Sequence, residues 1–214
     1  HDGGYVAYSE LCEQSKVVYS AGVGADVGFE LDWVNRYPKT KVHLYDPTIA
    51  RLPQEHKRFT FHKYGIGLQH RPLRNVELNS TLKMDIEWDE WGALQVIEDE
   101  ELKKFNQMLI EFHIVHTEPA CNLSPYFRQF YGNILGQVNQ DLFATYYEVM
   151  KRVTNWFYIF HIHANNSLPM IRVDGYSMPP LLELSFVRKS LVKQSEWDHT
   201  NFPIEGLDLP NKTN

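Results

Sequence analysis

The segment at residues 16–46, KVVYSAGVGADVGFELDWVNRYPKTKVHLYD, constrains the fold of this chain more than any other part. An apolar run from Val17 to Tyr19 is followed by Gly22 and Gly24, then by a helical pattern, then by a second apolar run that ends on Asp46. Glycines let backbone N–H groups approach a ligand closely, and an acid about 20 residues further on can bind ribose hydroxyls. The segment therefore predicts a strand–loop–helix–strand unit that holds a nucleotide or nucleoside.

The spacing of the glycines narrows the choice of ligand. The sequence contains no GxxxxGK[ST] motif of a phosphate-binding P-loop. The dinucleotide fingerprint GxGxxG is not met either, because Gly28 comes one residue late. A relaxed GxGxxxG followed by a strand-end acid suits a ligand with ribose and adenine but no pyrophosphate. S-adenosylmethionine (SAM) is the leading candidate, and NAD is the alternative.

Length and composition favour one domain with a small-molecule ligand. The chain has 214 residues and a net charge of −6, which argues against a nucleic-acid backbone as the main partner. No apolar run approaches the roughly 20 residues of a membrane span, so no membrane partner is expected. Cys12 and Cys121 lie far apart and are expected to be free thiols in a reducing compartment, which predicts a cytoplasmic location.

The periodicity predicts an α/β domain over residues 1–190 and a polar tail at 191–214, which we expect to fray. Because the chain opens on His, we expect it to be either a trimmed sequence or a domain excised from a larger protein. Strands are predicted at 16–21, 41–45, 59–64, 81–86, 108–114, 156–162 and 182–188. Helices are predicted at 5–13, 26–37, 93–106 and 140–153. The alternation predicts a seven-stranded, mostly parallel sheet that ends in an antiparallel hairpin.

Polar residues follow the predicted strands where ligands of open α/β sheets bind, at the strands' carboxyl ends. Gly65 and Ile66 follow the third strand. Six ionisable side chains are expected to converge on one rim: Asp46, Asp85, Glu87, Glu111, His113 and His163. Asp85 and Glu87 alternate with apolar residues, so both are predicted on one side of the fourth strand. The alternative is that these two acids are only neutralised, by Lys83, His62 or Arg74.

The order of the sequence blocks resembles one family of SAM-dependent methyltransferases, the FkbM-like and methyltransferase-like proteins, whose hallmark is KMDIEGxEW. The matching blocks span residues 14–190: VVYSAGVGADVGFE, VHLYDPT, KYGIG, LKMDIEWDEW, LIEFH, FHIHANN and LLELSFVRKS. The hallmark's second Glu and its aromatic residue are Glu90 and Trp91. Its usual Gly is Trp88 here, which predicts a reshaped acceptor pocket or a ring that stacks on the substrate.

The resemblance implies a class I, Rossmann-like methyltransferase fold and O-methylation, often of sugar hydroxyls, with a small-molecule or glycan acceptor. SAM is expected to contact Gly22, Val23, Gly24, Asp46, Gly65, Ile66 and Asp85. Acceptor-binding candidates are Glu87, Trp88, Glu111, His163 and Asn165. The alternatives are an NAD-dependent oxidoreductase and a non-catalytic methyltransferase-like binding domain.

His113 and Asp85 are the predicted catalytic residues. A sugar hydroxyl is a poor nucleophile, and a histidine with an ordinary pKa near 6.5 can accept its proton, oriented by Glu111 or Asp85. Some sugar O-methyltransferases of this fold instead use a divalent cation. The residues that could bind one are Asp85, Glu111, His113 and His163.

The segment at residues 117–134 follows the fifth predicted strand, where this fold usually places acceptor-binding elements. Its aromatic residues recur at helical spacing: Tyr126, Phe127, Phe130 and Tyr131. Such a pattern is typical of a helix packed on the sheet, and the alternative is an aromatic platform for a sugar ring.

Overall fold

The computed structural model describes residues 5–114, 142–173, 176–193 and 203–211. Its strands are β1 (Val17–Ala21), β2 (Lys41–Tyr45), β3 (Phe59–His62), β4 (Ser80–Met84), β5 (Phe105–His113), β6 (Phe157–Ala164), β7 (Ile171–Val173), β8 (Tyr176–Met178) and β9 (Leu181–Arg188). Its helices are α1 (Ser9–Gln14), α2 (Gly28–Arg36), α3 (Glu90–Val96), α4 (Asp99–Leu102), α6 (Leu142–Trp156) and the 3-10 turn η1 (Lys189–Leu191). The segment predicted to bind the acceptor, 117–134, and Cys121 lie outside the described residues.

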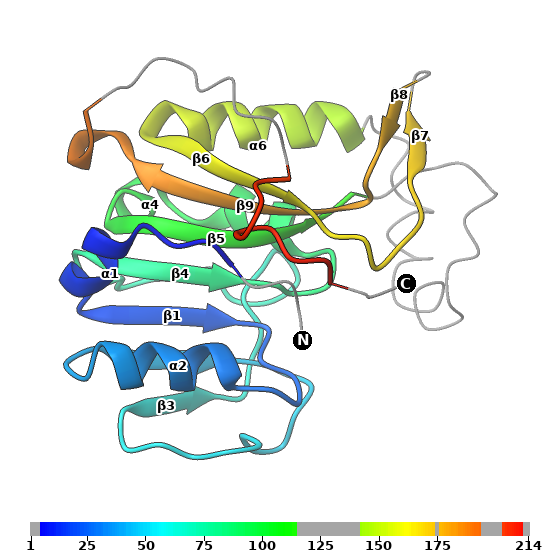
Figure 1. Cartoon of the computed structure of the whole chain (residues 1–214). Coiled ribbons are helices and arrows are strands. Elements are labelled where there is room, and N and C mark those ends of the chain that lie inside the picture. The colour runs from blue at the N-terminus through cyan, green and yellow to red at the C-terminus, as the bar shows by residue number, and fades with distance from the viewer. Residues whose placement is uncertain (1–4, 115–141, 174–175, 194–202, 212–214) are drawn as a thin grey trace.

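The main sheet has seven strands in the order β3-β2-β1-β4-β5-β9-β6. Neighbouring strands from β3 to β5 pair in parallel, whereas β9 is antiparallel to both β5 and β6. The arrows of β1, β4 and β5 accordingly point to the same edge of the molecule (Figure 1). All seven predicted strands are present, and the predicted α/β, class I methyltransferase fold is confirmed by this order and these directions.

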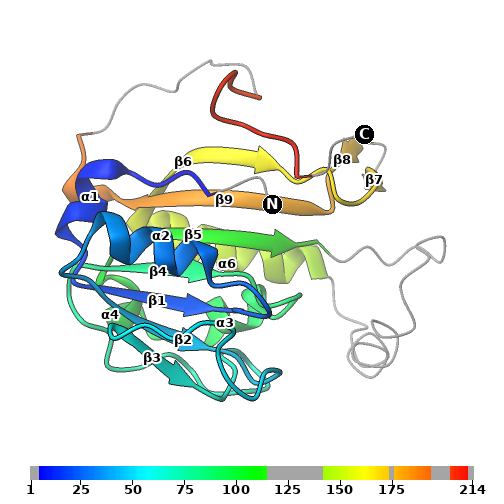
Figure 2. The same ribbon diagram turned by 60° about the horizontal axis from the view of Figure 1, so that its bottom comes forward.

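The last two strands of the sheet form the predicted antiparallel pair, with β9 inserted between β5 and β6. A small two-stranded sheet, β7–β8, joins them. It stands at the end of the sheet to which β5 points (Figure 1 and Figure 2). Because ligands of open α/β sheets bind at the carboxyl ends of the parallel strands, this end is where the site is expected.

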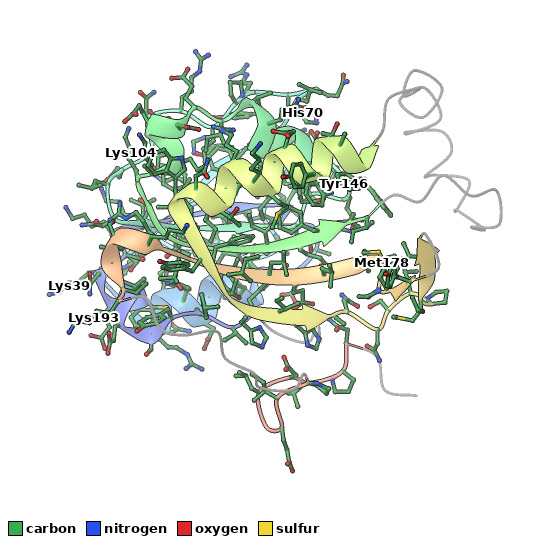
Figure 3. All side chains as sticks on the ribbon, turned by 90° about the horizontal axis from the view of Figure 1, so that it is seen from above. Lys39, His70, Lys104, Tyr146, Met178 and Lys193 are labelled. Carbon is green, nitrogen blue, oxygen red and sulfur yellow. The ribbon has the colours of Figure 1, made fainter. Side chains whose placement is uncertain are left out.

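Helices cover both faces of the sheet, which explains why β5 is buried along its whole length. On one face, α1 and α2 contribute Cys12, Trp33 and Val34 to a core with Leu109. On the other, α3, α4 and α6 pack against residues of β5 such as Met108, Ile110 and Phe112. Figure 3 shows α6 lying over this second face, with Tyr146 on the helix. The Cys12 side chain is a free, buried thiol, as predicted.

The helix predicted at 93–106 is wrong in its second half. The structure has α3 and the short α4 instead, and β5 already begins at Phe105. Ile97 is extended between the two helices, and the Arg152 guanidinium donates to the carbonyl oxygens of Leu94 and Ile97. The apolar pattern of this stretch is compatible with one helix, but the tertiary contact with α6 and the pairing of β5 interrupt it.

The C-terminal segment at residues 203–211 packs against the sheet, so the expectation that the tail frays is wrong for these residues. The Asp208 side chain is only 2% exposed. Its Oδ1 lies 2.9 Å from His161 Nε2 and 3.1 Å from His163 Nδ1, both on β6.

The helices of the described residues include none with the length and apolar character that a membrane span requires.

Candidate functional site

The loop between β1 and α2 begins with a glycine that packs directly on the end of β4. Gly22 has a φ of +78°, and a Cβ at this position would lie 1.4 Å from the backbone oxygen of Asp85. No side chain fits there without moving the backbone. The Gly22 N–H donates to the Tyr45 carbonyl at 3.0 Å, so the loop is fixed to the ends of both β2 and β4.

Gly24 presents the open side of the same loop. Its φ is +56°, and a Cβ added here would meet no atom within 4 Å. The Gly22–Gly24 loop is therefore packed tightly on one side and accessible on the other, which suits close approach of a ligand to the backbone. A cavity of about 420 Å³ lies beside Gly24 and is lined by residues that follow β2, among them Ile49, Arg51, Leu52 and Glu55.

Asp46, at the end of β2, holds the loop in place. Its Oδ2 accepts hydrogen bonds from the backbone N–H groups of Val23 (3.0 Å) and Gly24 (2.7 Å). Its Oδ1 accepts from the N–H and the hydroxyl of Thr48. Burial opposes ionisation of the Asp46 side chain, but the bonds from Thr48 and the loop outweigh it and lower its pKa. The hydrogen bond between Asp46 and a ribose hydroxyl stays a prediction. The Asp46 carboxylate would have to accept it in addition to these four hydrogen bonds or in place of one of them.

Gly65 and Ile66 follow β3 and lie where the adenine is expected. A cavity of about 380 Å³ is lined by Ile66 together with Tyr45, Tyr64, Arg71, Pro72, Leu73, Arg74 and Asn75. A Cβ on Gly65 would lie 2.5 Å from the ring of His70, so this turn is closely packed. Of the two predicted adenine residues, Ile66 lines this cavity and Gly65 does not, and the adenine contacts stay a prediction.

The turn after β4 is strained. β4 ends at Met84, and the next residues leave the strand, with φ values of +54° at Glu87 and +89° at Trp88. Left-handed backbone at residues with side chains costs about 1–3 kcal/mol each and persists only where the surroundings enforce it. Here Glu90 Oε1 accepts hydrogen bonds from the N–H groups of Ile86 (2.8 Å) and Trp88 (3.3 Å). Trp88, which stands where the hallmark usually has Gly, thus adopts a backbone conformation typical of glycine.

His113 ends β5 beside this turn and is nearly buried. Its Nδ1 lies 3.1 Å from Glu90 Oε1, and its Nε2 lies 3.4 Å from Glu87 Oε2. The Trp91 indole N–H donates to the His113 carbonyl at 2.9 Å, and the Trp88 ring centroid lies 4.9 Å from the imidazole centroid. The carboxyl end of β5 is therefore joined to the turn after β4 and to the first turn of α3.

The carboxylates around His113 change its acid–base behaviour. Burial lowers the pKa of His113, but Glu87, Glu90 and Asp85 outweigh it and raise the pKa to about 11. At neutral pH the imidazole is therefore protonated and cannot accept a further proton. The predicted role of His113 as general base needs a neutral imidazole, which this raised pKa opposes. The ring contacts Glu90 and Glu87, rather than the predicted Glu111 or Asp85. Burial also raises the pKa of Asp85, an effect that Lys83 and His113 offset in part.

A second polar cluster lies across β5, β9 and β6. Asn165 donates to Glu111 Oε1 at 2.8 Å, and Glu111 pairs with Glu183 across the β5–β9 ladder. His163, on β6, lies opposite Glu183, on β9. Because β9 stands between them, β6 and β5 are about 10 Å apart at the usual strand spacing. The predicted convergence of six side chains is therefore wrong for His163, whereas Glu111 lies on β5 itself, two residues from His113. Burial and the internal bonds of this cluster give no support to acceptor contacts of Glu111, His163 or Asn165.

Some polar residues of both clusters were not among the predicted site residues: Glu90, Glu183, Asp208 and Asn211. Glu90 could have been found, because it is the second Glu of the hallmark and stands next to an aromatic residue that binds the end of β5. Asp208 had no such signal, because its partners are more than 40 positions away in the chain.

Comparisons with known proteins bear on the fold alone. No family model matches the chain, and no curated protein matches it. Solved structures that resemble it include CalO1, a methyltransferase in calicheamicin biosynthesis in its SAH-bound form (15% identity, 82% of this chain and 49% of that one, TM-score 0.40). It also resembles human N-acetylserotonin methyltransferase in complex with SAM (14% identity, 82% of this chain and 48% of that one, TM-score 0.38). A third similar structure is the 16S rRNA methyltransferase KamB (12% identity, 87% of this chain and 98% of that one, TM-score 0.47).

The chain spans about half the length of CalO1 and of the human enzyme. At these identities and TM-scores, the class I methyltransferase fold rests on the strand order and directions of this chain itself.

Proposed function

We propose that this protein is a SAM-dependent O-methyltransferase that transfers a methyl group to a hydroxyl of a sugar. The observation that carries the proposal is the Gly22–Gly24 loop. It is pressed against Asp85 on one side, open on the other and tied to the Asp46 carboxylate. A loop of this kind at the carboxyl end of β1 suits a nucleoside ligand whose ribose meets the acid after β2.

The cofactor is proposed to lie along the carboxyl ends of β1, β2 and β4. Its methionine part passes over Gly22, Val23 and Gly24, where a Cβ on Gly24 would meet open space. Its ribose faces Asp46, and its adenine faces Gly65 and Ile66, where Ile66 lines a cavity. This placement brings the sulfonium close to Asp85, because the Asp85 backbone supports Gly22.

In the proposed reaction, the acceptor oxygen attacks the methyl carbon of SAM in line with the carbon–sulfur bond. The oxygen–carbon bond forms, the electron pair of the broken bond goes to sulfur to give S-adenosylhomocysteine (SAH), and the hydroxyl proton must leave. Because His113 is protonated at neutral pH, the Asp85 carboxylate is the better acceptor, and its raised pKa favours that role. The His113 cation then stabilises the ionised Asp85 before transfer.

The acceptor is proposed to bind over the strained turn. The Glu87 side chain is 81% exposed, and its carboxylate can accept hydrogen bonds from sugar hydroxyls. The Trp88 ring, which lies against His113, can stack on the apolar face of a sugar. The choice of a sugar also follows the resemblance of the KMDIE hallmark, and Trp88 is the residue that would distinguish this site from those with Gly there.

Calorimetry with SAM, SAH and NAD tests the cofactor, and incubation with methyl-labelled SAM and a panel of glycosides tests the reaction. Binding of SAH together with label transfer to a glycoside supports the proposal. Binding of NAD without SAH favours an oxidoreductase. Binding of SAH without transfer to any hydroxyl favours a non-catalytic domain.

Two variants identify the acid–base residue. Asp85→Asn is expected to lower kcat by about 10²- to 10⁴-fold, the range for loss of a general base. Glu100→Gln, an exposed acid paired with Lys103 on α4, is the matched control and is expected to keep the wild-type rate. Equal loss in both variants contradicts the role of Asp85.

A further inference from the structure

We propose that Asp85, Glu87 and His113 bind a divalent cation at the carboxyl ends of β4 and β5. One potential ligand atom from each of these residues lies within 4.8 Å of the other two. Within the part of the chain that the structure describes, no other group of three or more acids, histidines or cysteines has such spacing. The residues come from different elements, so the fold rather than the local sequence brings them together.

The separations suit a shared ion after a small movement. Two ligands about 2.1 Å from one ion are at most about 4.2 Å apart, and about 3 Å apart when adjacent. The 3.4 Å between His113 Nε2 and Glu87 Oε2 is of this adjacent kind. All three separations are within 4.8 Å, so none exceeds this limit by more than a few tenths of an ångström, which rotation of the exposed Glu87 or of Asp85 can close.

The histidine is already oriented as a metal ligand. Metal-binding histidines usually turn their second ring nitrogen to a carboxylate, which fixes the ring and makes the other nitrogen the ligand. His113 has this arrangement, because its Nδ1 lies 3.1 Å from the fully buried Glu90 and its Nε2 faces Glu87. An ion that binds here would displace the proton from Nε2 and would replace the positive charge that the protonated ring supplies in its absence. Glu90 also holds the backbone of Ile86 and Trp88, so one carboxylate positions the ring and the turn that carries Glu87.

The local charge favours a cation. Three carboxylates, from Asp85, Glu87 and Glu90, surround one imidazole, and Glu90 Oε2 is buried without a hydrogen-bond partner among the described residues. The nearby Lys83 ammonium donates instead to the Gly22 carbonyl at 2.9 Å. Among the described residues, no hydrogen bond to the Asp85 carboxylate is seen. A divalent ion would neutralise the excess negative charge of these carboxylates, and it could enter from solvent beside the exposed Glu87 side chain.

The ligand set selects the kind of cation. Two carboxylates with one imidazole suit Mn²⁺ or Zn²⁺ better than Mg²⁺ or Ca²⁺, which prefer oxygen ligands alone. Three protein ligands leave coordination positions free for an acceptor oxygen. If the proposed function holds, an ion here would bind and acidify the hydroxyl that receives the methyl group. That role rests on the proposed function, whereas binding of the ion does not.

Titration of the purified chain with Mn²⁺ alone, followed by the electron paramagnetic resonance signal of free Mn²⁺, tests the site without any cofactor. We expect one bound ion per chain and competition by Zn²⁺. Glu87→Gln should weaken binding by at least about tenfold, because even outer-shell partners are worth about 10- to 100-fold. Glu87 is exposed, so this variant is expected to fold. Glu100→Gln should bind Mn²⁺ as the wild type does.

The outcomes separate this proposal from the methyltransferase assignment. Absence of saturable Mn²⁺ binding, or equal affinity in the wild type and Glu87→Gln, overturns the cation site and shows that the cluster is an ion-paired network. Specific Mn²⁺ binding without any transfer from SAM retains the cation site and removes the proposed function. Transfer that persists in EDTA with no Mn²⁺ binding retains the function and removes the site.

Discussion

The Nδ1 atom of His113 lies 3.1 Å from Oε1 of Glu90, and this contact joins the end of β5 to the first turn of α3. The same oxygen accepts the N–H groups of Ile86 and Trp88, so one buried carboxylate positions both the histidine and the turn after β4. Glu90 touches no proposed ligand directly and is therefore a positioning residue.

Replacement of Glu90 by Ala is expected to destabilise the fold strongly. Removing one partner of a buried charged pair costs about 3–5 kcal/mol, because the other partner stays buried and loses its bonds. Urea unfolding followed by circular dichroism measures the change. Glu90→Gln keeps an acceptor oxygen and should cost less. Equal stability of the wild type and the Ala variant contradicts the role of this residue.

Trp88 offers a test of backbone strain. Gly adopts a φ of +89° freely, whereas Ala keeps the strain and loses the ring. Trp88→Gly is therefore expected to be more stable than Trp88→Ala by about 1 kcal/mol, the reverse of the usual order in regular structure. Chemical unfolding of the two variants side by side measures this difference. The usual order, with Ala more stable, argues against a left-handed backbone at this position.

The two loop glycines are expected to respond differently to the same change. Gly22→Ala forces a Cβ onto the Asp85 backbone oxygen and should prevent normal folding or lower Tm sharply. Gly24→Ala meets no atom, so only its positive φ opposes it, at about 1 kcal/mol. If SAM passes over Gly24, this variant should nevertheless bind SAH more weakly. Unchanged SAH affinity in folded Gly24→Ala places the ligand elsewhere.

Asp46 should make stability depend on pH in the acidic range. Its folded-state pKa is below the ordinary 3.8, so its contribution is complete above that value and is lost as pH falls through the folded pKa. Asp46→Asn is expected to be about 1–3 kcal/mol less stable than the wild type at pH 7, since charge-assisted bonds are lost. This gap should close as the pH falls below 3.8. Urea unfolding at several pH values measures it, and a gap that is constant with pH counts against the shift.

Asp208 is expected to fasten residues 203–211 to β6. Its carboxylate lies between His161 and His163, so Asp208→Ala should release this segment. Limited proteolysis should then cut within 203–211 faster than in the wild type. Glu205→Ala, a change at an exposed residue of the same segment, is the control and should be cut at the wild-type rate. Equal cleavage of all three proteins argues against the fastening role.

The sequence by itself determined the strands, the helix after the glycine loop and the class of fold. Those features depend on local patterns, such as the run from Val17 to Tyr19 before Gly22, and on periods that neighbouring residues create. It also placed Asp85, Glu87 and His113 near one edge, because parallel strands end together. Local patterns could not show where the helix after Trp91 is interrupted, since the Arg152 side chain on α6 sets that point.

Only the tertiary structure decided which polar residues meet. Insertion of β9 between β5 and β6 separates His163 from His113, and no pattern within either strand records that insertion. The protonation of His113 likewise depends on Glu90, which reaches it from α3. Spacing along the chain determines the secondary structure in which a residue lies. The pKa values, the sets of residues that could bind a ligand and the attachment of Asp208 depend instead on contacts between distant segments.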